Sequence, residues 1–184
     1  MINICVIGHR PNKIYGYDIY TEKYNLLRDK MQEIILSIKK YSNIEHVMCG
    51  MALGWDTIAF EEFHFNHSEI KIVGCIPFAN QHLYWHRDSD VRVYNEMKKV
   101  SHKLVYVDTI DKYKVNGTID GEWNVIKMQK RNEYMVDNSN VIISCWDGVK
   151  KGGTWNCLKY GLKSDNIKKI IIINPKTLNI EIIK

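Results

Sequence analysis

The chain has 184 residues, of which 45% are hydrophobic and 26% charged, and its formal net charge is +5. An intrinsically disordered chain needs lower hydrophobicity and higher net charge, so this composition predicts one globular domain spanning residues 1–184. No apolar stretch approaches the ~20 residues needed to cross a bilayer. The apolar start, residues 1–7, is too short for a signal peptide. We therefore expect a cytoplasmic protein that makes no membrane contact.

The cysteines predict neither a disulfide framework nor a zinc site. There are five, an odd number, and no two of them form a CxxC pair. Four lie in or beside apolar runs and Cys157 lies in a predicted helix, so we interpret all five as buried, reduced thiols. We expect no metal and no other cofactor. The lysines are dispersed in pairs, which favours a solvated surface, and we do not expect nucleic acid as a partner.

Along the chain, β-branched apolar runs alternate with longer amphipathic stretches. The apolar runs predict strands at Ile2–Ile7, His46–Cys49, Lys71–Ile76, Lys103–Val107, Val141–Trp146 and Lys169–Ile173, with a further edge strand at Leu178–Ile183. Helical spacing of apolar residues predicts helices at Thr21–Tyr41, Trp55–Phe65, Asp88–Val100, Trp123–Val136 and Thr154–Leu162. The polar segment Asp108–Gly121 is expected to be a loop.

The strands themselves predict the fold class. Runs such as VIISC and IIII are apolar throughout rather than alternating, which is typical of a parallel sheet covered by helices on both faces. Alternation of strands and helices gives right-handed crossovers and a doubly wound sheet. We therefore predict an α/β protein with a single Rossmann-like domain. Its sheet is mostly parallel, with six or seven strands and helices on both faces.

Four unusual segments directly follow predicted strands. In an open parallel sheet, the carboxyl ends of the strands line one crevice, and ligands bind there. The first segment is Gly8-His9-Arg10-Pro11, in which glycine permits a sharp turn and Arg10 offers a fixed fork of donors for phosphate or carboxylate. A turn that carries a surface arginine is the simpler alternative.

The second segment, GMALGWD, comprises Gly50 to Asp56 and includes Ala52, Gly54 and Trp55. Its small residues let a ligand approach the backbone, and the amides at the start of the following helix attract anions. Asp56 either compensates the helix dipole or accepts hydrogen bonds from ribose hydroxyls. Glu61 and Glu62, about one and a half turns further on, offer another carboxylate that could face the crevice.

The third segment contains Pro77, Phe78 and Gln81, followed by Trp85. Aromatic rings beside amide groups could sandwich a base and hydrogen-bond to its edge. The alternative is that Phe78 and Trp85 pack in the core.

The fourth segment begins with Trp146-Asp147-Gly148 and continues to Gly152-Gly153-Thr154. Such a turn at the start of a helix presents amides and a hydroxyl to a phosphate. Upstream, Arg131 and Asn132 lie on a predicted helix that could reach the same crevice, although a solvent-facing arginine is equally compatible. Neither a Walker lysine loop nor a GxGxxG fingerprint is present.

With these motifs taken together, in this order, the sequence resembles the SLOG superfamily and, within it, the YpsA-like branch. The resemblance covers nearly the whole chain and includes Glu61 after the second segment. The superfamily contains the Lonely Guy phosphoribohydrolases, DprA proteins that bind single-stranded DNA, and sensor domains for nucleotide-derived signals. The resemblance implies a Rossmann-like fold, a ligand with ribose and phosphate, and a homo-oligomer, either a dimer or a tetramer.

One departure from that pattern affects the expected activity. The Lonely Guy pattern PGGxGTxxE has a glutamate shortly after its Gly-Gly-Thr turn, whereas here Thr154 is followed by Trp-Asn-Cys-Leu. Cleavage of an N-glycosidic bond needs a charged group at the developing ribosyl cation. We therefore expect first a module that binds a nucleotide or an ADP-ribose-like signal. The second hypothesis is an N-glycosidic hydrolase or transferase that uses Asp56 or Glu61, and the third is a binder of single-stranded DNA.

Overall fold

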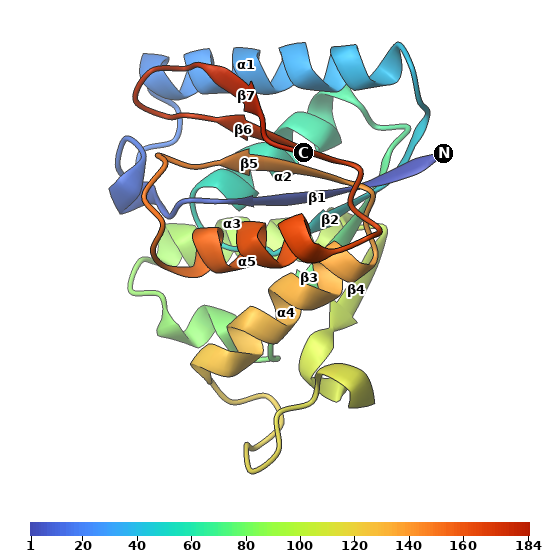
Figure 1. The fold of residues 1–184 in the computed structure, drawn as a ribbon. Coiled ribbons are helices and arrows are strands. Elements are labelled where there is room, and N and C mark those ends of the chain that lie inside the picture. The colour runs from blue at the N-terminus through green and yellow to red at the C-terminus, as the bar shows by residue number, and fades with distance from the viewer.

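Seven strands form one sheet in the order β4-β3-β2-β1-β5-β6-β7 in the computed structural model, which describes residues 1–184 (Figure 1). β7 (Ile180–Ile182) pairs antiparallel with β6 at one edge, and all the other pairings are parallel. The parallel strands are β1 (Ile2–Gly8), β2 (Ile44–Cys49), β3 (Lys71–Ile76), β4 (Lys103–Tyr106), β5 (Val141–Cys145) and β6 (Lys169–Ile173). The predicted Rossmann-like α/β fold is confirmed.

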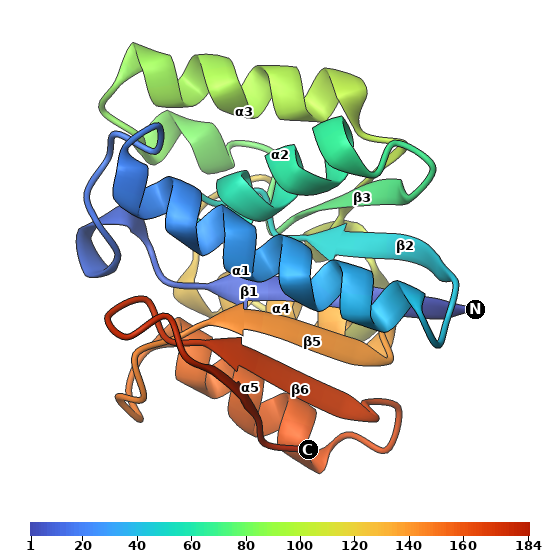
Figure 2. The same ribbon diagram turned by 90° about the horizontal axis from the view of Figure 1, so that it is seen from above.

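The helices cover both faces of this sheet, as Figures 1 and 2 show. On one face lie α1 (Glu22–Lys39), α2 (Trp55–Asn66) and α3 (Asp88–Val100); on the other lie α4 (Val125–Asp137) and α5 (Gly153–Lys163). Two cores result, one of 26 and one of 17 buried residues. Burial on both faces is the reason that every residue of β5 is buried and apolar or small. None of the helices is both long enough and apolar enough to traverse a lipid bilayer.

The segment between β4 and α4 is more ordered than the predicted loop. It contains two short 3-10 helices, η3 (Val107–Thr109) and η4 (Asp111–Tyr113). The predicted start of the next helix at Trp123 is two residues early. Asn124 caps α4, its Oδ1 accepting a hydrogen bond of 2.7 Å from the amide of Ile126. Trp123 therefore belongs to the loop, where its side chain is half exposed.

All five cysteines are free and buried, as predicted. Burial raises the pKa of the Cys75 thiol to about 12, and it also raises the pKa of Cys49 and Cys145. These side chains are protonated at neutral pH and act as small apolar residues of the core.

The order in which strands are added to the sheet reverses at β1, the first strand. From β1 the chain adds β2, β3 and β4 on one side, and it then crosses over to place β5 and β6 on the other. The loops that follow β1 and β5 therefore diverge toward opposite faces. Ligands of doubly wound sheets bind in the crevice that this divergence opens.

Candidate functional site

Two adjoining cavities lie where the strands end. The first, here called the polar cavity, has a volume of about 330 Å³, and the second, the aromatic cavity, has about 320 Å³. Arg10, Asn12 and Met128 line both, so the two cavities form one continuous cleft. The polar cavity is also lined by Ile7, Gly8, His9, Lys13, Ala52, Asp56, Arg131, Asn132, Gly153 and Thr154. The aromatic cavity is also lined by Pro11, Tyr17, Leu53, Phe78, Gln81, Tyr84, Trp85 and Trp123.

Backbone hydrogen bonds fix the loop after β1 against its neighbours. The amide of His9 donates to the Cys145 carbonyl over 3.1 Å, and the His9 carbonyl accepts from the Trp55 amide over 3.1 Å. Gly8 is required here because an added Cβ would lie 2.5 Å from the ring of Trp55. This loop is therefore locked to the end of β5 and to the start of α2.

The His9 side chain joins two of the predicted segments. Its Nε2 lies 2.9 Å from Asp147 Oδ1, and its Nδ1 lies 3.4 Å from Thr154 Oγ1. Burial acts to raise the pKa of Asp147, but hydrogen bonds from His9 and the Val149 amide outweigh it and leave that pKa below its ordinary value. Asp147 is therefore ionised at neutral pH, and it orients the imidazole toward the hydroxyl at the start of α5.

Arg10 is the charged group at the junction of the two cavities. No protein carboxylate lies within ion-pair distance of its guanidinium, and the Asp56 carboxylate pairs with Arg131 instead. Burial lowers the pKa of Arg10, and the neighbouring Arg131 acts in the same direction, while Asp56 opposes them. The cleft thus contains a partly desolvated cation that the protein itself does not neutralise.

The loop after β2 brings the backbone close to a buried ion pair. Arg131 donates a hydrogen bond from Nη1 to the Gly50 carbonyl, and the same nitrogen lies 3.9 Å from Asp56 Oδ2. Asp56 also accepts a hydrogen bond of 3.3 Å from the Ala52 amide. Burial raises the pKa of Asp56, and the charges of Arg131 and Arg10 only partly offset this effect.

Two predicted site residues of this loop have mainly structural positions. Gly54 has φ +94°, and an added Cβ would lie 2.6 Å from the His9 carbonyl oxygen. Trp55 is fully buried in the core beneath Gly8 and lines neither cavity. The prediction that Trp55 contacts ligand is therefore corrected, because its ring fills the space between β1 and α2.

Arg131 and Asn132 face inward from α4, so the solvent-facing alternative for the arginine is wrong. Both side chains are buried, and Arg131 Nε donates to Asn132 Oδ1 over 2.9 Å. The two residues and Thr154 lie on the same cavity although α4 and α5 are different helices.

The third predicted segment forms a wall of the aromatic cavity. Phe78 is buried and meets the ring of Tyr84 edge to face, with centroids 6.2 Å apart. Gln81 is buried, and Trp85 is half-buried with its ring against Tyr94. Phe78 and Trp85 thus combine core packing with a position on the cavity. That their rings sandwich a base stays a prediction. Pro77 is buried behind the wall and lines neither cavity.

The remaining predicted residues lie at the edges of the site. Three of them, Gly50, Asp147 and Gly152, line neither cavity. Gly50 binds the cavity residue Arg131, Asp147 binds the cavity residue His9, and Gly152 precedes the cavity residue Gly153. Gly152 has φ +88° and is exposed just before α5, where it lets the chain turn into the helix. Gly153 and Thr154 begin α5 and face the polar cavity.

Glu61 does not belong to the site, and its predicted catalytic role is corrected. Its Oε2 accepts a hydrogen bond of 2.6 Å from Arg28 on α1, and its Oε1 accepts one of 3.2 Å from Tyr20. Glu62 is likewise bound by Arg28, over 3.1 Å. Both carboxylates lie on the face of α2 that meets α1, about a turn and a half beyond Asp56 and away from the cleft.

Sequence reasoning missed the residues that close the aromatic cavity. The ring centroid of Trp123 lies 6.2 Å from that of Tyr84. Trp123 lies on a loop that is fixed by the buried side chain of Lys127. Lys127 donates to Asp108 Oδ2 over 3.1 Å and to the Ile119 carbonyl over 2.6 Å, and Asp108 accepts from the Gly121 amide over 2.9 Å. Nothing in the local pattern distinguishes this lysine from a surface one.

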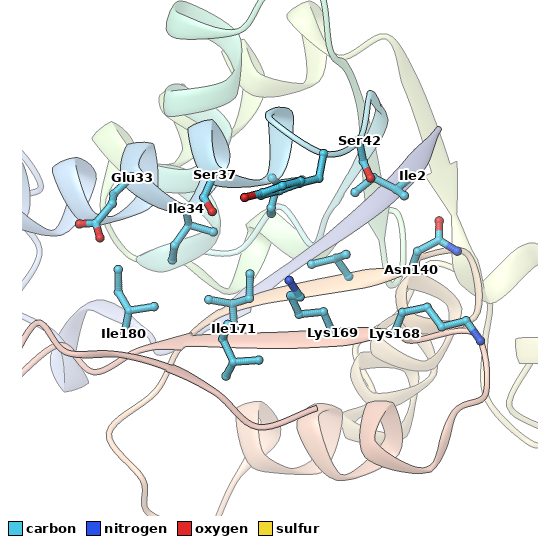
Figure 3. Close-up of a pocket in the computed structure, with 14 residues that line it drawn as sticks. Ile2, Glu33, Ile34, Ser37, Ser42, Asn140, Lys168, Lys169, Ile171 and Ile180 are labelled. Atoms are coloured by element: carbon cyan, nitrogen blue, oxygen red, sulfur yellow. The ribbon is translucent and has the colours of Figure 1, made fainter.

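A further cavity, of about 340 Å³, lies at the other end of the sheet between α1 and β6 (Figure 3). Half of its lining residues are aliphatic, among them Ile34, Ile171 and Ile180. Its charged residues, Glu33, Lys168 and Lys169, are exposed at the mouth. Because it contains no buried charged group, we take the cleft at the carboxyl ends as the functional site. Nowhere in the chain do three or more His, Cys, Asp or Glu side chains cluster as metal ligands.

Comparison with known proteins gives consistent results. The family model described as the YspA SLOG family (YpsA) matches residues 4–178. The SPbeta prophage-derived protein YoqJ of Bacillus subtilis is 38% identical over 141 residues, which cover 75% of this chain and 81% of that protein. The X-ray structure of DNA processing protein A (DprA) from Streptococcus pneumoniae superposes with a TM-score of 0.58 at 11% identity. That match covers 94% of this chain but only half of the DprA chain, and it indicates a shared fold.

Proposed function

Since this chain belongs to the YspA SLOG family, we propose that it binds a nucleotide-derived ligand in the cleft at the carboxyl ends of its strands. The phosphate occupies the polar cavity and the base occupies the aromatic cavity. The ribose lies between them, within reach of Asp56. The same assignment suits a mononucleotide or an ADP-ribose-like signal.

The observation that carries this proposal is the position of Arg10. It lines both cavities, burial lowers its pKa, and no protein carboxylate forms an ion pair with it. Removing a charge from water is costly unless a partner compensates, so an anionic ligand is the expected partner. The amide groups at the start of α5 and the Thr154 hydroxyl add further donors to the same cavity.

The base is assigned to the aromatic cavity because its walls carry several rings. Phe78, Tyr84, Trp85 and Trp123 come from two separate segments and line one space. Stacking of a base on aromatic side chains is worth about 1–3 kcal/mol per base. A phosphate alone would leave this half of the cleft unused.

Calorimetry of the purified protein with AMP, GMP, ADP, ADP-ribose and NAD tests the proposal, together with mass spectrometry of any molecule that copurifies. We expect binding of at least one of these ligands, and we expect Arg10→Ala to weaken it at least tenfold, because charge-assisted hydrogen bonds are worth roughly 1.5–3 kcal/mol. Arg92→Ala, which removes an exposed arginine on α3, is the charge-matched control and should leave affinity unchanged. Absence of binding to the whole panel would refute the proposal.

Asp56 favours one alternative, an N-glycosidic hydrolase or transferase. It is a buried carboxylate that lines the polar cavity, and its pKa is raised by burial. A group of this kind suits proton transfer to a leaving base or support of a ribosyl cation. Chromatography of AMP and NAD after incubation with the protein distinguishes the two functions. Release of free base that Asp56→Asn abolishes would establish the enzyme, and unchanged ligands would leave binding alone.

A further inference from the structure

We propose that Gln81 selects a base that carries an exocyclic amine, through its side-chain oxygen Oε1. The inference rests on the proposed function and assigns a specificity to the aromatic cavity. Gln81 opens η2 (Gln81–Tyr84), the short 3-10 helix that follows β3, and it lines that cavity while being almost fully buried.

The orientation of the Gln81 amide follows from its one hydrogen bond. Nε2 lies 3.3 Å from the carbonyl oxygen of Met51, in the loop after β2. A carbonyl oxygen only accepts hydrogen bonds, so the nitrogen must be the atom that faces it, and the oxygen must point elsewhere. This hydrogen bond fixes the orientation of the side-chain amide and leaves its oxygen, Oε1, without a partner.

That acceptor has no partner within the protein. Gln81 Oε1 is buried and receives no hydrogen bond. Buried polar atoms in folded proteins are nearly always paired, and an exception signals a missing partner such as a ligand or an ordered water. Because the atom accepts and does not donate, the missing partner must supply an N–H or O–H group.

The surroundings favour a base as the source of that donor. Tyr84 and Trp123 stand on the same cavity with their rings 6.2 Å apart, and Phe78 lies edge-on to Tyr84. A flat heteroaromatic ring held among these side chains presents its donors along its edge, in the plane of the ring. Adenine, guanine and cytosine each carry an exocyclic amine on this edge, whereas uracil and hypoxanthine offer only a ring N–H there.

Matched ligand pairs test the inference without altering the protein. AMP and purine riboside 5′-monophosphate differ only in the 6-amine, and GMP and IMP differ only in the 2-amine. We expect loss of the amine in one of the pairs to weaken binding by about tenfold in calorimetry, the effect of one good buried hydrogen bond. If nucleotides bind but both pairs show equal affinities, no exocyclic amine binds Oε1, and the inference fails while the proposed function stands. If no nucleotide binds, both fail.

A substitution gives the complementary test. Gln81→Met retains the length of the side chain and removes the acceptor. We expect it to lower the affinity for the preferred amine-bearing nucleotide to that of the partner ligand that lacks the amine, and to leave the affinity for that partner ligand unchanged. Gln129→Met, the same change on α4 away from this wall, should preserve the difference within the pair. A Gln81→Met protein that still discriminates between the two ligands would overturn the assignment.

Discussion

At Gly50 the backbone packs tightly against two charged side chains of the cleft, Arg131 and Asp56. An added Cβ would overlap the guanidinium of Arg131 and would lie 2.6 Å from Asp56 Oδ2. Both of those side chains are buried, and Arg131 is tied to the Gly50 carbonyl and to Asn132. The absence of a side chain at this position is therefore what allows the ion pair to form beneath the cleft.

The first prediction concerns this contact. Gly50→Ala must push Arg131 away from Asp56, and we expect it to destabilise the protein by about 1–3 kcal/mol, the usual cost of overpacking a tight interior. It should also weaken nucleotide binding, because Arg131 lines the polar cavity. Urea denaturation and calorimetry measure the two effects.

Gly153→Ala is the control for that experiment. Gly153 begins α5, and nothing lies within 4 Å of the Cβ that the change would add. Its stability should therefore match or slightly exceed that of the wild type, since alanine favours the helix. Equal stability of Gly50→Ala and Gly153→Ala would show that the Arg131–Asp56 pair does not depend on the glycine.

At the scale of elements, the segment between β4 and α4 depends on one buried ion pair. Lys127 and Asp108 are both about 1–2% exposed, and the lysine also binds two loop carbonyls, those of Ile119 and Glu122. Such a pair costs much desolvation energy, which excellent geometry must offset. Here it fixes the loop that carries Trp123 against Tyr84, and so it shapes the aromatic cavity.

The second prediction follows from that geometry. Lys127→Met leaves Asp108 buried without a cation, and we expect it to destabilise the protein by about 3–5 kcal/mol in urea denaturation. Replacing both partners, as Lys127→Met with Asp108→Asn, should cost less than the single change. The surface pair Lys114–Asp120 in the same loop is the control, and Lys114→Met should change stability by less than about 1 kcal/mol. Equal effects at the two lysines would contradict the role assigned to Lys127.

The elements also show which features the sequence encodes locally. Strands such as β5 and β6 were predictable because burial on both faces leaves continuous apolar runs. The inward position of Arg131 and the engagement of Glu61 by Arg28 were not, because both depend on how separate helices pack. Lys127 escaped prediction for the same reason: its partners, Asp108 and two carbonyls, are brought to it by a loop whose path the local pattern leaves open.

At the scale of the whole molecule, the sheet is shared by two cores. The core beneath α1 and α2 contains Leu27, and the core beneath α4 and α5 contains Leu158; both side chains are fully buried. The cleft draws residues from the ends of β1 and β3 and from α2, α4 and α5, so its geometry requires both helical layers to be in place. The two layers should therefore fold and unfold together.

The last prediction tests this coupling. Leu27→Ala and Leu158→Ala each open a cavity in a different core, and each should destabilise by about 2–5 kcal/mol. Because each core packs on the same strands, both changes should shift a single urea transition, with far-UV circular dichroism and tryptophan fluorescence giving the same midpoint. A biphasic curve, in which Leu27→Ala shifts one step and leaves the other where it was, would show instead that the layers unfold separately. In that case the cleft would lose one wall before the other. A bound nucleotide would then raise the urea midpoints of both unfolding steps only if it contacts both helical layers.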